Sequence, residues 1–329
     1  MTNRVKSATA VDVIAIEEPH APTLYKAEES ARHYARESRA PNTRRAYRSD
    51  WADFTAWCQE HGRTALPASP ETIMLYLSDR AETLKTLTLQ RRLTAISQAH
   101  KAADLDTPTA DRAVRRIMTG IRRQKGTAQE GKAPAITREI RAMVEHLSPT
   151  LRGQRDRALL LLGFAGAFRR SELVGLDVGD LAWSDDGLTV RLKRSKTDQE
   201  GAGRTVGIPY GSKPGTCPVR AVRGWLTAAG IADGPLFRGV DPHRNLGQTR
   251  LSDKTVARVV KNAAGAVGLD PAKYAGHSLR AGLATAAAHA GVAERVIMAQ
   301  TGHKSLPMVR KYIREGSLFT QNAAAEVGL

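Results

Sequence analysis

The segment from Gly126 to Pro134, GTAQEGKAP, most constrains the fold because it separates two stretches of the chain with different patterns. Gly, Pro and polar side chains without apolar periodicity are typical of a linker between domains. Apolar residues recur at helical spacing before it, and helical and alternating patterns both occur after it. We predict a flexible tail over 1–20, a helical domain over 21–125, a linker over 126–135, and a mixed domain over 136–329 that ends in a helix.

The same segment matches the pattern of a nucleotide-binding P-loop up to Lys132. The match fails at Ala133, which replaces the Ser or Thr that would bind magnesium, and at Pro134, which obstructs the helix that must follow. A helical pattern rather than a strand precedes the segment. ATP is therefore not an expected cofactor.

Four helices are predicted before the linker from apolar residues at helical spacing. Asn42 or Thr43 is expected to cap the first, and Ser69 the second, which has Pro70 at its first position. The expected ranges are about 43–62, 71–82, 87–103 and 108–125.

Positive charge is the most unusual property of the composition. Lys and Arg number 50 against 33 Asp and Glu, which gives a net charge of +17 and a pI near 10.3. Such an excess is costly self-repulsion unless a polyanion offsets it, so nucleic acid is the expected partner. An anionic membrane is the alternative, but the longest apolar stretch, 158–168, is too short to span a bilayer.

Part of this charge lies on the outward faces of the first helices. The cations concerned are Arg44, Arg45, Arg48, Lys85, Arg91, Arg92, Arg115, Arg116, Arg122 and Arg123. Solvation would explain any single one of them, whereas several basic faces in one helical unit favour contact with a phosphate backbone.

The two cysteines, Cys58 and Cys217, are far apart and lack the spacing of metal ligands. We therefore expect free thiols, a reducing cytosol and no bound metal.

Beyond the linker the pattern is mixed. Three short apolar stretches at 181–183, 188–192 and 205–208 predict a small antiparallel sheet, with a tight turn at Asp185 to Gly187 and a longer polar turn at 193–203. Helices are expected over 137–147, 155–166 (buried), 218–229, 252–267, 278–290, 293–300 and 305–313. The predicted fold class is mainly α with a small antiparallel sheet.

Six residues after the linker carry side chains suited to phosphate transfer: Arg169, Lys196, His277, Arg280, His303 and Tyr312. Two guanidiniums can hold the non-bridging oxygens of a phosphodiester and so replace metal ions. A phenol becomes a nucleophile when a base and cations are near, and Tyr312 lies among Lys304, Arg310, Lys311 and Arg314. Lysine can protonate the leaving oxygen, and histidine can carry a proton.

Each of these residues also has an ordinary structural explanation when it is taken alone. Arg169 or Arg280 would form an ion pair, His277 would bond at a helix start, and Tyr312 would pack against its neighbours. Glu172 would orient Arg169 or His277 without itself reacting.

The order and spacing of the set resemble the tyrosine recombinase family, also called the phage integrase family. Arg169 with Glu172 resembles its Arg-x-x-Glu box, and His277 with Arg280 resembles its His-x-x-Arg box. His303 and Tyr312, nine residues apart, resemble the second histidine and the nucleophile. The segment 194–197 resembles the lysine hairpin, and the helices before the linker are similar to those of Cre-type two-domain recombinases.

Two assignments have a competing neighbour. Arg170 adjoins Arg169, and the three-residue spacing to Glu172 selects Arg169. Lys193 competes with Lys196 for the hairpin role.

The resemblance implies a site-specific recombinase that needs neither metal nor ATP. Tyr312 would attack DNA to form a 3′-phosphotyrosine, while Arg169, Arg280 and His303 hold the phosphate. Lys196 would protonate the leaving 5′ oxygen, and His277 would assist proton transfer at Tyr312. Strand exchange would then pass through a Holliday junction.

The resemblance also implies how DNA is bound. The two domains would clamp duplex DNA, two protomers would occupy an inverted repeat, and two such sites would form a tetramer. Lys254 and Arg258, on the helix from Ser252, would contact bases or phosphates in the major groove. The apolar segment 317–329 would pack on its own domain or dock into a neighbouring protomer.

Two other functions remain open at this stage. A relaxing topoisomerase of the related type uses a similar chemical set without strand exchange. A basic DNA-binding or architectural protein would need no chemistry at Tyr312.

Overall fold

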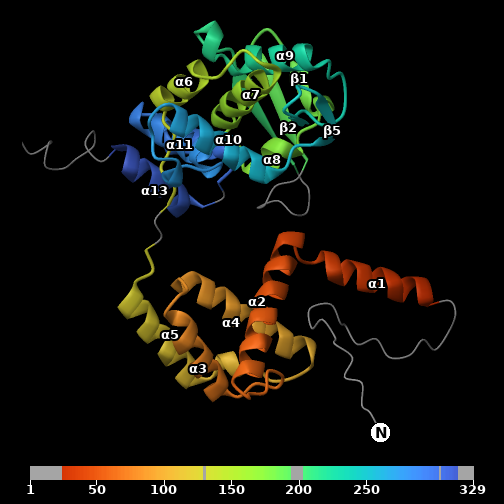
Figure 1. Cartoon of the computed structure of the whole chain (residues 1–329), viewed down its shortest axis with the longest axis vertical. Helices are drawn as coiled ribbons and strands as arrows, with labels where there is room; N and C mark the ends of the chain where they lie inside the picture. The colour runs from red at the N-terminus through yellow and green to blue at the C-terminus, as the bar shows by residue number, and fades with distance from the viewer. Residues whose placement is uncertain (1–23, 129–130, 194–202, 304, 318–329) are drawn as a thin grey trace, which may run out of the picture. The chain divides into compact units, whose positions relative to one another are not determined.

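The computed structural model describes residues 24–128, 131–193, 203–303 and 305–317. The chain divides into two compact units, Met1–Glu130 and Gly131–Leu329, which are described separately (Figure 1). Lys196, the predicted tail over 1–20 and nearly all of the segment 317–329 lie outside the described residues.

The first unit is helical in its described part. Its helices are α1 (Tyr25–Glu37), α2 (Pro41–Glu60), α3 (Pro70–Ala81), α4 (Thr86–Ala102) and α5 (Arg112–Lys125), with a 3₁₀ turn at Pro108–Ala110. Helix α2 begins earlier than predicted because Pro41 supplies a preset φ angle at the first position. The side chain of Asn42 accepts a hydrogen bond from Arg45 instead of capping the helix.

Four of these helices enclose the core of the first unit. Ser69 caps α3 as predicted, since its hydroxyl accepts a hydrogen bond from the backbone N–H of Thr72 at 3.1 Å. The largest buried side chains are Phe54, Trp57, Ile73, Tyr76, Leu77, Leu89 and Ile96. Helix α1 was not predicted, and its tyrosines Tyr25 and Tyr34 are exposed.

The second unit combines helices with two small antiparallel sheets, so the predicted fold class is confirmed. Its helices are α6 (Thr137–Glu145), α7 (Leu151–Ala165), α8 (Arg170–Gly175), α9 (Pro218–Ala229), α10 (Asp253–Ala266), α11 (His277–His289), α12 (Glu294–Thr301) and α13 (Leu306–Ser317). The strands are β1 (Leu181–Trp183), β2 (Gly187–Leu192), β3 (Arg204–Pro209), β4 (Arg238–Val240) and β5 (Leu246–Arg250).

The three predicted strands form one sheet in the order β1-β2-β3. The turn from Ser184 to Gly187 joins β1 to β2, and Leu192 pairs with Arg204 where β2 and β3 approach the hairpin. The second sheet, β4 with β5, was not predicted because its strands are short and contain Gly and charged residues without alternation.

Helix α7 lies in the core of the second unit beside α9 (Figure 1). It begins at Leu151, before the predicted position, because the hydroxyl of Thr150 accepts the N–H of Gly153 at 3.2 Å. At Gly163 an added Cβ would lie 2.8 Å from Leu279 of α11 and 2.9 Å from Leu173 of α8. This glycine therefore lets both helices approach α7, and both carry predicted site residues.

No helix in the described part of the chain combines the length and apolar character needed to cross a bilayer. Within the same residues, no group of three or more His, Cys, Asp or Glu side chains is arranged to hold a metal ion.

Candidate active site

Helix α11 places two of the predicted residues one turn apart. It begins at His277 after Gly276, and the hydroxyl of Ser278 accepts the N–H of Ala275 at 3.0 Å to fix the entry of the chain. His277 is exposed at the start of the helix, whereas Arg280 is 1% exposed. One helix thus presents an imidazole at the surface and a guanidinium beneath it.

Arg280 is a buried cation held by a backbone carbonyl. Its Nη1 donates to the carbonyl oxygen of Ala167 at 2.8 Å, and its Nη2 is buried with no hydrogen-bond partner among the described residues. Burial, together with the positive charges of Arg169 and Arg204, lowers the pKa of Arg280 to about 10, although Glu172 opposes this. The charge is therefore kept in an environment that would accommodate an anion.

Arg169 immediately precedes α8 and is held by Glu172. The carboxylate of Glu172 accepts the backbone N–H of Arg169 at 2.9 Å and a second bond from its guanidinium. Arg170 points elsewhere, since its guanidinium lies 3.7 Å from Asp253 and its side chain packs against Gly276. The two adjacent arginines thus have different partners, Arg169 with Glu172 and Arg170 with Asp253.

His303 follows the end of α12, and its tautomer is defined by Thr301. The hydroxyl of Thr301 donates to the carbonyl oxygen of Ile297 at 2.7 Å, so it must accept from Nδ1–H of His303, also at 2.7 Å. The neutral imidazole therefore carries its proton on Nδ1. Burial and the charges of Arg280, Arg169, His277 and Arg204 lower the pKa of His303 to about 4.

Tyr312 is held on α13 against α11. Val309, one turn earlier, is buried against Ala284 of α11 and Ile297 of α12. The hydroxyl of Tyr312 lies 2.7 Å from Nε2 of His277, and its ring lies 5.9 Å from that of His303. Arg310 pairs with Glu294 at 3.2 Å. Among the described residues, Arg280 interacts electrostatically with Tyr312 and so brings positive charge to the phenol.

The lowered pKa of His303 predicts a pH-dependent stability. A histidine in the unfolded chain titrates near pH 6.5. Between about pH 6.5 and pH 4, His303 is therefore protonated in the unfolded chain and neutral in the folded protein. This stability is fully present above about pH 6.5 and is lost as the pH falls toward 4. We expect the free energy of unfolding to fall less between pH 7 and pH 4.5 in His303→Gln than in the wild type. Urea unfolding at the two pH values measures this difference. His289→Gln, which removes an exposed imidazole, is the control, and equal pH dependence in both variants would contradict the prediction.

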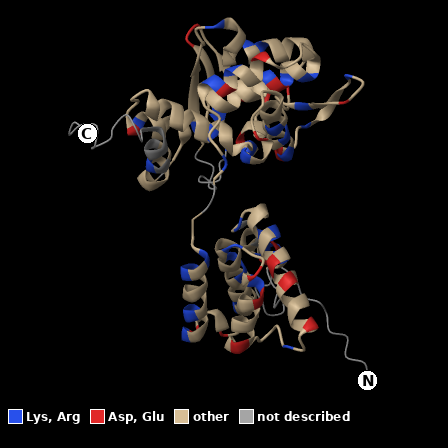
Figure 2. Ribbon diagram, turned by 60° about the vertical axis from the view of Figure 1, so that its left-hand side comes forward, with Lys and Arg blue, Asp and Glu red and all other residues tan. Residues whose placement is uncertain are grey.

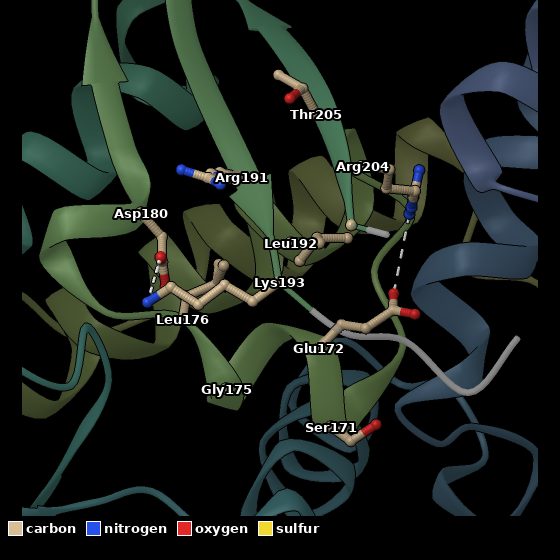
Figure 3. Close-up of a pocket in the computed structure, with 11 residues that line it drawn as sticks. Ser171, Glu172, Gly175, Leu176, Asp180, Arg191, Leu192, Lys193, Arg204 and Thr205 are labelled. Atoms are coloured by element: carbon tan, nitrogen blue, oxygen red, sulfur yellow. Dashed lines mark ion pairs between the residues drawn. The ribbon is translucent and has the colours of Figure 1, made fainter. Parts of the chain in front are cut away.

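Lys193, the competitor of Lys196, forms an ion pair at the end of β2. Its ammonium lies 2.7 Å from Asp180 (Figure 3). It also lies 4.0 Å from Asp177. A cleft of about 820 Å³ lies beside this pair, between α8 and the strands β2 and β3. Since Lys193 has acidic partners, Lys196 remains the candidate for the proton donor.

Arg204 is a site residue that the sequence did not reveal. It begins β3, and its Nη2 lies 3.9 Å from the carboxylate of Glu172 (Figure 3). Its charge acts on both Arg280 and His303. Only the fold brings it to the site, because no motif spacing connects it with the other residues.

Lys and Arg residues lie on helices of both units (Figure 2). The predicted DNA contacts Arg45, Arg48, Lys85, Lys254 and Arg258 are exposed, and Arg44 is partly buried. Lys254 and Arg258 lie on α10 while Val256 and Val260 of the same helix are buried, so a basic face of this helix points outward.

Arg91 and Arg92 make internal contacts in the first unit. Arg91 donates two bonds to the buried carboxylate of Asp50, at 2.7 and 2.9 Å. Arg92 is 12% exposed and bonds to Asp53 and to the hydroxyl of Tyr76. These pairs hold α4 against α2 and α3, which gives both arginines a structural role within the unit.

Comparison with known proteins agrees with this geometry. The phage integrase family matches residues 137–317, and the phage integrase N-terminal SAM-like domain matches residues 31–104. The integrase/recombinase xerD homolog of Selenomonas ruminantium is 46% identical over 297 residues, which cover 89% of this chain and 87% of the relative. The chain belongs to the phage integrase family. It is a tyrosine recombinase, an enzyme whose partner is DNA.

Two further relatives extend the comparison. The recombinase Cre of Escherichia phage P1 is 28% identical over 284 residues, which cover 79% of this chain and 80% of Cre. The XerH site-specific recombinase, solved in a post-cleavage complex with a palindromic difH substrate, superposes with a TM-score of 0.67 at 15% identity. That match covers 91% of this chain and 84% of XerH, and it shows a shared fold.

Proposed function

We propose that this tyrosine recombinase cleaves DNA with Tyr312 as the nucleophile and His277 as the group that receives its proton. The observation that carries the proposal is the 2.7 Å contact between the phenol and Nε2 of His277, close to Arg280. A base within hydrogen-bond reach of the attacking oxygen is the first requirement of such chemistry.

The reaction is balanced in atoms and charge. The phenolic oxygen of Tyr312 forms a bond to phosphorus as its proton passes to His277, and the bond from phosphorus to the 5′ oxygen breaks. Lys196 protonates that oxygen. In the second half the 5′-hydroxyl of the partner strand gives its proton to Lys196 and attacks the phosphotyrosine. The bond from phosphorus to the phenolic oxygen breaks, and His277 returns its proton to Tyr312. Because one ester replaces another, no ATP is consumed.

Arg169 and Arg280 hold the non-bridging oxygens of the phosphate in this proposal. Arg280 has a buried donor without a partner among the described residues, and guanidiniums suit paired bonding to an anion. The neutral His303 presents a bare Nε2, so it must bind a proton before it can donate to the phosphate. The negative charge of bound DNA favours that protonation.

The proposed DNA site is an inverted repeat bound by two protomers, and synapsis of two sites makes a tetramer. The palindromic substrate of XerH supports an inverted repeat. The proposed contacts to DNA are the exposed cations Arg45, Arg48 and Lys85 and the partly buried Arg44 on the first unit, with the exposed Lys254 and Arg258 on α10.

The test is to trap the covalent intermediate. Duplexes are first selected from a randomised pool by their binding to the full chain, and a nick is then placed near the predicted cleavage point so that the released fragment diffuses away. We expect a protein–DNA adduct without metal or ATP, which peptide mapping locates at Tyr312. An adduct on another residue would overturn the assignment.

The rival function as a relaxing topoisomerase is tested with a supercoiled plasmid that lacks the selected sequence. A recombinase that needs a synapsed site leaves this plasmid supercoiled, whereas a topoisomerase relaxes it. Exchange between two plasmids that carry the site provides the positive control.

The separation of Arg169 from Arg170 gives a further prediction. Arg169→Ala is expected to slow cleavage of the trapped substrate about 10²- to 10³-fold, because it removes donors to the developing charge. Arg170→Ala removes a half-exposed charge with its partner on α10, and we expect a change of about twofold, as for exposed substitutions. Single-turnover cleavage rates measure both, and a larger effect at Arg170 would reverse the assignment.

A further inference from the structure

Arg204 caps the C-terminal end of α12, the helix that precedes His303. Its Nη1 donates to the carbonyl oxygen of Gln300 at 3.1 Å and lies 3.5 Å from that of Ala299. The last carbonyls of a helix have no partner within the helix and carry partial negative charge, so a cation there fixes the helix end. Arg204 comes from β3, which makes this a link between the sheet and α12.

Gly302 allows the guanidinium to lie directly against the turn before His303. An added Cβ at Gly302 would be 2.9 Å from both Cζ and Nε of Arg204. Gly302 also adopts a φ angle of +64°, which favours glycine. Because Gly302 has no Cβ and turns the chain at a positive φ angle, the backbone directly before His303 lies against Arg204. The position of His303 therefore depends on the Arg204 side chain.

The other side of Arg204 faces the carboxylate that holds Arg169. Its Nη2 lies 3.9 Å from Oε2 of Glu172, the oxygen that accepts the backbone N–H of Arg169 (Figure 3). The carboxylate is 1% exposed, so it interacts with two guanidiniums away from water. One arginine therefore connects the two halves of the phosphate site, Arg169 just before α8 and His303 after α12.

This arrangement is not explained by stability alone. Nε and Nη2 of Arg204 are buried and have no hydrogen-bond partner among the described residues. Leaving buried donors of a charged group unpaired is unfavourable. A side chain that served only to close α12 would be expected to satisfy these donors or to leave them in water.

We propose that Arg204 is a positioning residue for DNA cleavage, which holds Glu172 with Arg169 on one side and the backbone of His303 on the other. The inference rests on the proposed function, since it concerns the geometry of the same phosphate site. It does not require Arg204 to touch DNA, because its unpaired nitrogens are buried.

The variants Arg204→Gln and Arg204→Lys test this role in the full chain. Displacing a group by about 1 Å can cost about 10² in rate, so we expect Arg204→Gln to slow single-turnover cleavage about 10²-fold while DNA affinity is retained. Arg204→Lys keeps the charge and one donor, and we expect it to restore part of the rate. Arg157→Gln is the matched control, since Arg157 also donates to a backbone carbonyl, that of Gly215 at 2.9 Å, which lies on no element of the phosphate site.

The titration of His303, followed by NMR of labelled imidazoles, gives a readout that needs no activity. Loss of the nearby cation in Arg204→Gln should move the midpoint of His303 to higher pH, whereas Arg204→Lys and Arg157→Gln should leave it near the wild-type value. A change in fold stability alone would not produce this pattern. If Arg204→Gln does not fold, the cleavage rate of Arg204→Lys decides the question. A full wild-type rate in Arg204→Lys would show that a guanidinium linking Glu172 to the carbonyl of Gln300 is not needed.

The outcomes separate this inference from the proposed function. If the wild-type protein forms no adduct at Tyr312, the proposed function fails, and the His303 titration still reports whether Arg204 acts on it. If the wild-type adduct forms and Arg204→Gln matches the wild type in both rate and titration, the role of Arg204 is overturned alone.

Discussion

Replacing Tyr312 with Phe is expected to abolish the covalent adduct completely while DNA binding is preserved. The variant removes one oxygen, which lies 2.7 Å from Nε2 of His277, and leaves the ring against α11. Without this oxygen there is no nucleophile for phosphorus, so the loss is total rather than graded. Denaturing gels measure the adduct, and gel-shift titration measures the affinity.

Tyr210→Phe is the matched control for this substitution. Tyr210 is another phenol of the second unit, and Arg220 stacks over its ring at 5.2 Å. We expect this variant to form the adduct at the wild-type rate. Persistence of the adduct in Tyr312→Phe would show that a different residue attacks, and equal behaviour of the two variants in every assay would favour a DNA-binding protein without catalysis.

The sequence predicted most helices and the main sheet because their local patterns agree with the tertiary structure. Caps such as Ser69 and the turn at Gly187 depend on neighbours in the chain, so they are visible in the sequence. The strands β4 and β5 escaped prediction because their pairing, rather than their composition, makes them strands. Helix α1 escaped because its described tyrosines are exposed and offer no clear buried stripe.

The site was predicted from the order of the motifs along the chain. The structure adds tertiary contacts that the spacing between residues in the sequence cannot reveal. His277, Arg280 and Tyr312 come together because α13 packs on α11 through Val309. The cations next to Tyr312 in the sequence suggested a local source of charge, and the side chains of Lys304, Lys311 and Arg314 are not among those that the structure describes. Arg310 pairs with Glu294, and Arg280 brings positive charge to the phenol from another helix. Arg204 could not be found in this way, since its partners are backbone carbonyls of α12 and a carboxylate of α8.

Replacing Arg280 with Met is expected to abolish cleavage without destabilising the protein. Burial lowers the pKa of this guanidinium to about 10, so the fold disfavours its charge by about 3 kcal/mol. Methionine fills a similar space without that charge, and replacing buried ions with apolar groups is often neutral or stabilising. The carbonyl of Ala167 loses its partner, which costs about 1–3 kcal/mol. These two effects nearly cancel, so the melting temperature should be unchanged or slightly raised.

The same substitution removes a principal donor to the phosphate. Loss of one preorganised donor costs about 10²–10³ in rate, and a guanidinium offers two, so we expect cleavage to fall at least about 10³-fold. Arg280→Lys keeps a charge but not the planar fork, and it should recover only part of the rate. Single-turnover cleavage and thermal unfolding of the two variants give the comparison.

The cleavage rate and the melting temperature of Arg280→Met test different roles of this residue. Wild-type cleavage in this variant would remove Arg280 from the phosphate site, and a much lower melting temperature would mean that its charge stabilises the fold. Loss of cleavage with retained stability is the outcome expected of a residue whose charge is unfavourable in the free protein and offset by DNA. It would show that the buried cation of Arg280 is retained for the phosphate rather than for folding.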